Sequence, residues 1–458
     1  METEDNLIHN ETGHLAPAIG TDSVPTHRRP SQQKPLVGSY VALLLFMIVY
    51  YLRPGDWIPG LSTVPFAKVA GILALLALVF SLQRIRRRLP REVLFLALLI
   101  GQLVAAAAMS PVWRGGAFQT TLTFAKVFVV VVVMAVTINT PRRLRMLIFI
   151  QAASVAAIAA VTLWKGDLLG GRLTGTLGAD YSDSNGLALA FVISLPLCLA
   201  LLFLTRTWIW KAVWTSAILV LTYAIFQTGS RGGFLSLIVA GAICLWEFAI
   251  RGRRGYLLVC AALVGVIVLQ SSGGMLVGRL KGTFNPSEDT AVAYASAQAR
   301  QQLFWRSIEV TKEYPLFGVG PGNFQQLSGN WHVAHNSYTQ MSSEGGIPAL
   351  IFYVLILWSG FMNIRATRQF ANGQRQATLL AKGLHASLAG YVIGSFFLSV
   401  PFSFFPYILV AYTTALSWIS KKSEAHSWKL DAPPVVPDST PLMYATSSSE
   451  NGNFWRAP

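Results

Sequence analysis

About twelve long apolar segments dominate this chain and limit the folds it can adopt. The hydrocarbon core of a bilayer, about 30 Å thick, needs roughly 20 apolar residues per helix, and about 17 are tolerated. The composition agrees, with 53% hydrophobic residues, 12% charged residues and a mean hydropathy of +0.49. We therefore predict an all-α polytopic membrane protein with about 12 transmembrane helices. The segments are 37–52, 64–82, 92–109, 118–138, 144–164, 186–204, 208–226, 230–250, 255–271, 346–364, 383–400 and 403–419.

The positions of lysine and arginine predict the orientation of these helices. The formal charge is +16, and the basic residues concentrate in alternate loops, on the side of the N-terminal tail. Loops that stay in the cytoplasm are enriched in Lys and Arg, so both termini are expected to be cytoplasmic. This pattern also leaves no basic patch that would require a nucleic-acid partner. The residues are Arg84, Arg86, Arg87, Arg88, Arg91, Arg142, Arg143, Arg145, Arg206, Lys211, Arg251, Arg253, Arg254, Arg365, Arg368, Arg375, Lys382, Lys421 and Lys422.

The chain divides into five parts by composition. Residues 1–35 and 421–458 are polar tails that we expect to be disordered and cytoplasmic. Residues 36–271 hold the predicted helices 1 to 9, residues 272–345 form a large loop on the opposite face, and residues 346–420 hold helices 10 to 12. The first apolar run follows a long polar leader without a clean cleavage site, which favours a retained span over a removed signal peptide.

The large loop contains two recognisable segments. Residues 297–314 predict an amphipathic helix on or near the membrane surface, with Leu303, Phe304 and Ile308 near one face and Arg300 elsewhere, among the charged residues. The following PLFGVGPGNF, residues 315–324, is rich in Pro and Gly and favours tight turns. A phosphate-binding loop is the alternative, but the strand and helix that such a loop needs are missing from the pattern.

Arg231 is a charge on the face opposite the basic loops. It lies at the outer end of the eighth predicted span, where burial of a charge costs roughly 2.5 to 3.5 kcal/mol. It could simply extend to the interface. Alternatively, Gly232 and Gly233 beside it would let another backbone or a ligand approach closely.

Arg172 is a second arginine on that face. It could be a surface residue paired with Asp180 or Asp183. Two arginines on one face nevertheless suit a diphosphate or another anion, because guanidinium groups bind phosphate oxygens bidentately. Arg279 and Arg300 are weaker candidates for the same role.

A polar segment, WHVAHNSYTQMSSEGGIPAL at residues 331–350, leads into the tenth predicted span. His335 could be structural, or its neutral imidazole could accept a proton in catalysis. Glu344 could orient that histidine, bind an acceptor hydroxyl, or cap the helix near its positive end. His332, His335 and Glu344 lack an i, i+4 ligand pair, and the three cysteines lie apart in apolar segments, so we expect neither metal nor cofactor.

Four segments together resemble the bacterial O-antigen ligase and polymerase superfamily. They are RLTGTLGADYSDSNGLA from Arg172, GSRGGFLSL around Arg231, the stretch from Arg300 to PLFGVGPGNF, and HNSYTQMSSEGGIPAL from His335. The resemblance implies a GT-C-type membrane glycosyltransferase that needs no metal or nucleotide sugar. Such enzymes transfer a glycan from undecaprenyl diphosphate to an acceptor hydroxyl on the periplasmic face of the inner membrane. Ala349 departs from the family pattern, which there usually has Gly or a polar residue.

The resemblance also implies roles for individual residues. His335 resembles the general base that deprotonates the acceptor, and Arg172 and Arg231 resemble a clamp for the diphosphate. Arg300, Asn336 and Glu344 are further candidates for substrate binding. An inverting single displacement is expected, with fixed positive charge stabilising the leaving diphosphate.

Several functions remain open from the sequence. A ligase that uses lipid A core as acceptor is the leading hypothesis, while a polymerase of lipid-linked glycans and a protein O-oligosaccharyltransferase share its chemistry. A lipid-glycan flippase would be a different class, expected to carry charged residues within its mid-membrane spans. A structural scaffold would leave the outer arginines unexplained.

Overall fold

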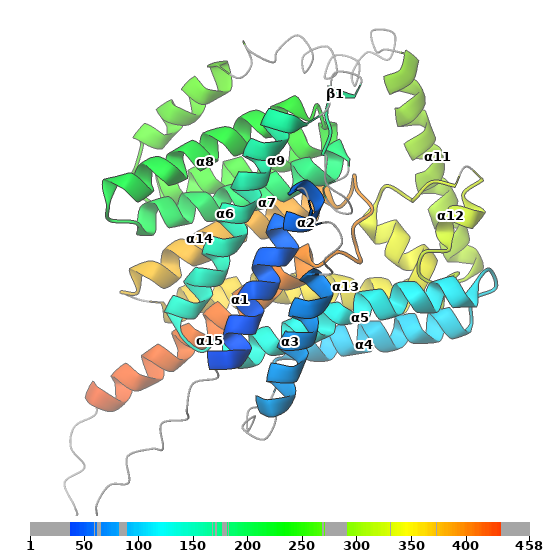
Figure 1. Ribbon diagram of the computed structural model, residues 1–458, viewed down its shortest axis with the longest axis horizontal. Coiled ribbons are helices and arrows are strands. Elements are labelled where there is room, and N and C mark those ends of the chain that lie inside the picture. The colour runs from blue at the N-terminus through cyan, green and yellow to red at the C-terminus, as the bar shows by residue number, and fades with distance from the viewer. Residues whose placement is uncertain are drawn as a thin grey trace, which may run out of the picture. The chain divides into compact units, whose positions relative to one another are not determined.

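The computed structural model describes residues 37–431 apart from 59, 62–65, 82–88, 167, 170–171, 176–180, 182, 268–269, 271–290, 330 and 372. Helices make up most of this part (Figure 1). The expected disorder of the tails concerns residues outside this part, except for 421–431, where the prediction was wrong because these residues continue the last helix. The helices are α1 Val37–Leu52, α2 Pro54–Trp57, α3 Phe66–Ser81, α4 Arg91–Ala108, α5 Arg114–Thr137, α6 Pro141–Lys165, α7 Ser184–Leu204, α8 Trp208–Gln227, α9 Arg231–Cys244, the π-helical η3 Leu245–Ile250, Tyr256–Ile267, α11 Ala291–Glu313, α12 Phe324–Leu327, α13 Ser337–Phe370, α14 Arg375–Gly394 and α15 Phe405–Asp431.

Each of the twelve predicted spans contains a helix, so the all-α polytopic membrane fold is confirmed. Among the described residues, seven helices are long and apolar enough to cross a membrane. The number of crossings, twelve, stays a prediction. The one described sheet is a hairpin of two short strands, β1 Leu168–Leu169 and β2 Arg172–Leu173, which pair antiparallel.

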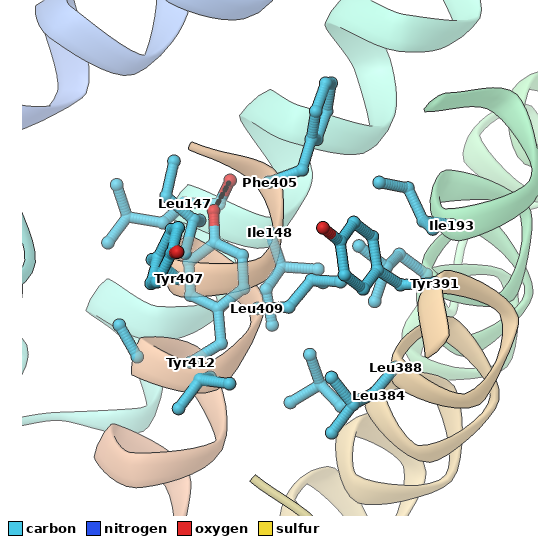
Figure 2. Packing of buried hydrophobic residues seen from close by; sticks show 14 of the residues in the cluster. Leu147, Ile148, Ile193, Leu384, Leu388, Tyr391, Phe405, Tyr407, Leu409 and Tyr412 are labelled. Carbon is cyan, nitrogen blue, oxygen red and sulfur yellow. Dashed lines mark hydrogen bonds between the residues drawn. The ribbon is translucent and has the colours of Figure 1, made fainter. Parts of the chain in front are cut away.

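The core forms where α6, α7, α14 and α15 meet (Figure 2). Leu384, Leu388 and Tyr391 of α14 pack there with Ile193 of α7 and residues of α6 and α15. α7 is buried on most of its surface, because α6, α8, α9 and α14 all pack against it. This core fixes α7 and α14, whose ends carry the polar groups discussed below.

Helix α13 is broken at Gly346, whose φ of 80° lies outside the helical region. The helix begins at Ser337, nine residues before the predicted span, because the Asn336 side chain accepts hydrogen bonds from the amides of Tyr338 and Thr339 at 2.9 and 3.1 Å. The sequence therefore placed the helix start too late. A cap followed by a glycine break makes a short helix in front of the long one.

The glycine-rich segment 315–324 closes against this break. The amides of Val319 and Gly320 donate to the carbonyl oxygens of Ser343 and Glu344, both at 2.9 Å, and the amide of Ile347 donates to Pro315 O at 2.8 Å. Gly318, Gly320 and Gly322 all have positive φ. The predicted structural turn is thus confirmed, and its amides pair with carbonyl groups that the break in α13 leaves free.

Helix α11 covers the predicted amphipathic segment and starts six residues earlier. Leu303, Ser307 and Val310 form its buried face, and Leu303 and Val310 cluster with Val319, Phe324 and Ala334. The apolar face of α11 therefore packs on other parts of the loop. Its contact with a membrane surface stays a prediction.

Candidate functional site

The N-terminal ends of α7 and α9 lie together and are linked by polar side chains. Asp183 caps α7 by accepting from the amides of Asn185 and Gly186 at 2.6 and 3.0 Å. Ser230 caps α9 by accepting from the amide of Gly233 at 3.1 Å, and its hydroxyl donates to Asn185 Oδ1 at 2.8 Å. Two positive helix ends therefore point to the same place, an arrangement that favours an anion.

Arg172 connects these two helix ends. Its Nε donates to Thr228 O at 2.9 Å, and one of its terminal nitrogens donates to Asn185 Oδ1 at 3.1 Å. The half-buried guanidinium is therefore held in a fixed position beside the start of α9. Arg231 is the first residue of that helix. The structure thus brings Arg172 and Arg231, which are 59 positions apart in the sequence, to the same helix ends.

Gly232 and Gly233 serve close packing of protein groups. A Cβ on Gly232 would lie 2.5 Å from Phe397 Cβ, and a Cβ on Gly233 would overlap Ala188 of α7. The close approach expected at these glycines is therefore made by neighbouring side chains. It holds the start of α9 against α7 and against the segment that follows α14.

A cavity of about 450 Å³ lies near the start of α9, which contributes Leu235 to its lining, whereas Arg172 and Arg231 do not line it. Its polar lining comes from Arg300 and Gln301 of α11 and from His335 and Asn336 at the start of α13. The remaining wall is apolar and includes residues of α9, α11 and the end of α14. These residues are Leu235, Phe304, Ala334, Ile393, Phe396 and Phe397. A mixed lining of this kind suits a ligand with both a charged and an apolar part.

His335 faces this cavity with a strained backbone and an unused ring nitrogen. Its φ is 52°, a conformation that non-glycine residues adopt rarely and that is often associated with functional sites. Its Nδ1 is buried and has no hydrogen-bond partner among the described residues. Burial first, then the charge of Arg300, lower the pKa of His335 from 6.5 to about 4, against the opposing effect of Asp183. The imidazole is therefore neutral at pH 7 and free to accept a proton.

Arg300, a weaker candidate in the sequence, lines the same cavity and is the cation that most affects this histidine. Its side chain makes no hydrogen bond or ion pair within the described part of the chain. Burial lowers its pKa, the charge of Asp183 raises it, and that of Arg231 lowers it again. These effects show that Asp183, Arg231, Arg300 and His335 share one electrostatic environment.

Comparison with known families identifies this region. Residues 215–354 match the family model described as O-antigen ligase. This segment is therefore similar to an O-antigen ligase domain. The resemblance to the O-antigen ligase and polymerase superfamily is thereby confirmed, and with it a ligase- or polymerase-type membrane activity in general terms. No curated protein matched the chain in a separate comparison.

The matched segment of the O-antigen ligase domain runs from α8 into α13 and contains Arg231, Arg300, His335, Asn336 and Glu344. Arg172 lies before it, so only the structure joins this arginine to the domain. Within the described residues, no group of three His, Cys, Asp or Glu side chains has the arrangement of a metal site.

Glu344 occupies a different part of the O-antigen ligase domain. It is fully buried near the end of the short helix that precedes Gly346, and it does not line the cavity of His335. Its Oε2 accepts from the amide of Gly322 at 2.9 Å, and Gln340 Nε2 lies 3.4 Å from each of its carboxylate oxygens. The carboxylate therefore fastens the glycine-rich turn to α13. It lies next to the start of the long helix that follows Gly346, but it binds the amide of Gly322 and the side chain of Gln340.

Sequence reasoning considered Asp183 only as a possible partner of Arg172, and it ranked Arg300 as a weaker candidate. Asp183 stands directly before a helical run, which is the usual signal of an N-cap, but its position beside Arg300 needs the tertiary fold. Asn336 was predicted to bind substrate. Its side-chain oxygen is committed to the cap of α13, although the residue also lines the cavity.

Proposed function

We propose that this chain transfers a glycan from undecaprenyl diphosphate to an acceptor hydroxyl in the cavity of His335 and Arg300. The observation that carries the proposal is one cavity lined by a neutral imidazole and a guanidinium, neither of which has a hydrogen-bond partner among the described residues. The imidazole suits the acceptor hydroxyl and the cations suit the diphosphate.

In the proposed reaction, His335 removes the proton of the acceptor hydroxyl as the acceptor oxygen attacks the anomeric carbon. The bond from that carbon to the diphosphate breaks, and its electron pair stays on the phosphate oxygen. Attack from the side opposite the diphosphate inverts the anomeric configuration. Arg300, Arg231 and Arg172 would stabilise the developing negative charge more than the ground state. His335 and the arginines together supply the base and the positive charge, so the proposed reaction takes no metal or other cofactor.

Donor binding would also strengthen the base. Arg300 contributes to the low pKa of His335, and a diphosphate bound to Arg300 would offset that positive charge. The pKa of His335 would then rise toward neutrality, where a general base works best at physiological pH. Base strength would thus be coupled to the presence of the donor.

We place the cavity on the periplasmic face of the inner membrane, with both termini in the cytoplasm. The positive-inside rule supports this orientation, because arginines of three alternate loops line one cavity at the other end of α7 and α14. The acceptor is left open among lipid A core, a lipid-linked glycan and a protein, since ligase, polymerase and protein O-oligosaccharyltransferase share these steps.

The test is transfer by the purified full-length protein from undecaprenyl diphosphate-linked oligosaccharide to a panel of these three acceptors. We expect product with at least one acceptor and loss of at least 100-fold in rate for His335→Ala. His332→Ala is the matched control, because that exposed histidine lies three residues away and does not line the cavity. Full activity of His335→Ala would refute the mechanism. Translocation of the donor across vesicles without transfer would favour a flippase.

A further inference from the structure

A second, larger cavity of about 1200 Å³ lies at the other end of the helices that carry the candidate site. It is formed by the starts of α1, α6, α8 and α14 and by the end of α7. α14 begins at this cavity with Arg375 and reaches the cavity of His335 with Ile393. Its 20 residues span about 30 Å at 1.5 Å per residue, which is the thickness of a bilayer core. The two cavities are therefore separated by about one membrane thickness.

The second cavity concentrates positive charge. Its arginines are Arg142, Arg143, Arg145, Arg206 and Arg375, and no Asp or Glu belongs to the described residues that line it. Arg143 and Arg375 each donate to a backbone carbonyl oxygen, at 2.7 and 2.8 Å. The other three side chains make no hydrogen bond or ion pair with any residue the structure describes. The positive ends of α6, α8 and α14 add to this field. Such an accumulation of like charge favours a bound anion.

The cavity also has an apolar wall. Leu201, Leu204 and Met146 contribute to it together with Trp210 and Trp214. Phe149 packs edge-on against both tryptophans, with ring centroids 5.6 and 5.3 Å apart. An aromatic and aliphatic wall beside arginines at helix ends is typical of the membrane interface. It fits an amphiphile better than a free phosphate or a nucleotide.

We propose that this cavity binds an anionic glycerophospholipid. The phosphate would lie among Arg142, Arg145 and Arg206, and an acyl chain would lie along Trp210 and Leu204. Basic pockets between transmembrane helices on the cytoplasmic side recognise anionic headgroups in this way. The volume exceeds that of pockets for drug-sized molecules, as a lipid requires. The site is separate from the cavity of His335, so it does not depend on the proposed transferase reaction.

The test is a titration of the detergent-solubilised full-length protein with phosphatidylglycerol, phosphatidylcholine and glycerol phosphate, followed by native mass spectrometry. We expect phosphatidylglycerol to bind at least tenfold more tightly than phosphatidylcholine. The double variant Arg145→Gln/Arg206→Gln should lose most of this preference, because each basic side chain near a phosphate adds to the attraction. Arg365→Gln, an exposed arginine of α13 outside the cavity, is the matched control and should keep it.

Three outcomes would overturn the proposal. One is equal affinity of the native protein for the two lipids, and the second is an unchanged preference in the double variant. The third is full displacement of phosphatidylglycerol by glycerol phosphate, which would indicate a site for a free phosphate. If the double variant does not fold, as judged by its thermal unfolding without lipid, Arg142→Gln replaces it and carries the same expectation.

Discussion

Replacement of Glu344 can separate a structural carboxylate from one that acts on substrate. Glu344→Gln keeps an oxygen for the amide of Gly322, whereas Glu344→Ala removes it from a site that is 1% exposed. Loss of the acceptor leaves a polar group without its partner, which costs about 1 to 3 kcal/mol, and truncation of the buried side chain adds the cost of a cavity. We therefore expect Glu344→Ala to lower the free energy of unfolding by about 2 to 4 kcal/mol, and Glu344→Gln to lower it by less than half as much.

The assay combines thermal unfolding in detergent with the transfer reaction at saturating donor and acceptor. A structural Glu344 predicts that Glu344→Gln retains most of the transfer rate and that Glu344→Ala loses rate together with stability. Glu344→Gln with native stability but no transfer would refute this reasoning, because the negative charge would then act in the reaction itself. Native stability of Glu344→Ala would refute the energetic estimate instead.

Three further predictions concern the charges and the backbone around the site. Gly346→Ala should destabilise the protein by more than Gly329→Ala in thermal unfolding. Both glycines have a φ of 80°, and a backbone conformation of this kind costs another residue about 1 to 3 kcal/mol. Only at Gly346 would the added Cβ also overlap the carbonyl oxygen of Leu316. Arg368→Ala should lower the free energy of unfolding by about 2 to 3 kcal/mol, because Glu247, which is 3% exposed, would lose its 2.6 Å ion pair with Arg368. Arg365 is an exposed residue of the same helix, and Arg365→Ala should change the free energy of unfolding little. In the proposed mechanism the neutral imidazole of His335 is the active form, and its pKa without donor is about 4. The kcat/KM for the donor should therefore hold as the pH falls from 7 to about 5 and then decrease through pH 4, and an acid limb of this parameter near pH 6.5 would contradict the assignment. The stability due to the neutral imidazole, fully present above pH 6.5, should be lost as the pH falls from 6.5 to 4.

The helices were predictable because a bilayer sets their length and apolar character, and each segment of suitable length became a helix. Two local features also followed from residue type, namely the glycine-rich turn and the amphipathic helix. The early start of α13 did not follow from hydropathy. Its first residues are polar, and only the Asn336 cap signals that they are helical.

The contacts between segments were not predictable in the same way. Arg172 bonds to Asn185 and to the carbonyl oxygen of Thr228, a partner that residue type cannot single out because every residue has such a carbonyl. Asn185 Oδ1 accepts from both Arg172 and Ser230, so three segments meet at one amide oxygen. Such a junction depends on which helix ends pack together, whereas hydropathy predicts only how many helices there are and how long each one is.

The placement of Arg300 shows how one helix face decides the site. The sequence put Arg300 away from the apolar face of its helix, yet residues three and four apart share a face, and buried Leu303 and Ser307 therefore turn Arg300 inward. Burial there lowers the pKa of Arg300, and Asp183 and Arg231 lie close enough for their charges to affect it. Partial burial of Arg300, which makes no ion pair with a described residue, raises the free energy of the empty site, and an anion that binds there would remove this cost. The same face of α11 that builds the small core of the loop thus places Arg300 in the cavity of His335. A bound diphosphate would stabilise the charge of Arg300 and would raise the pKa of His335, which makes the histidine a stronger base.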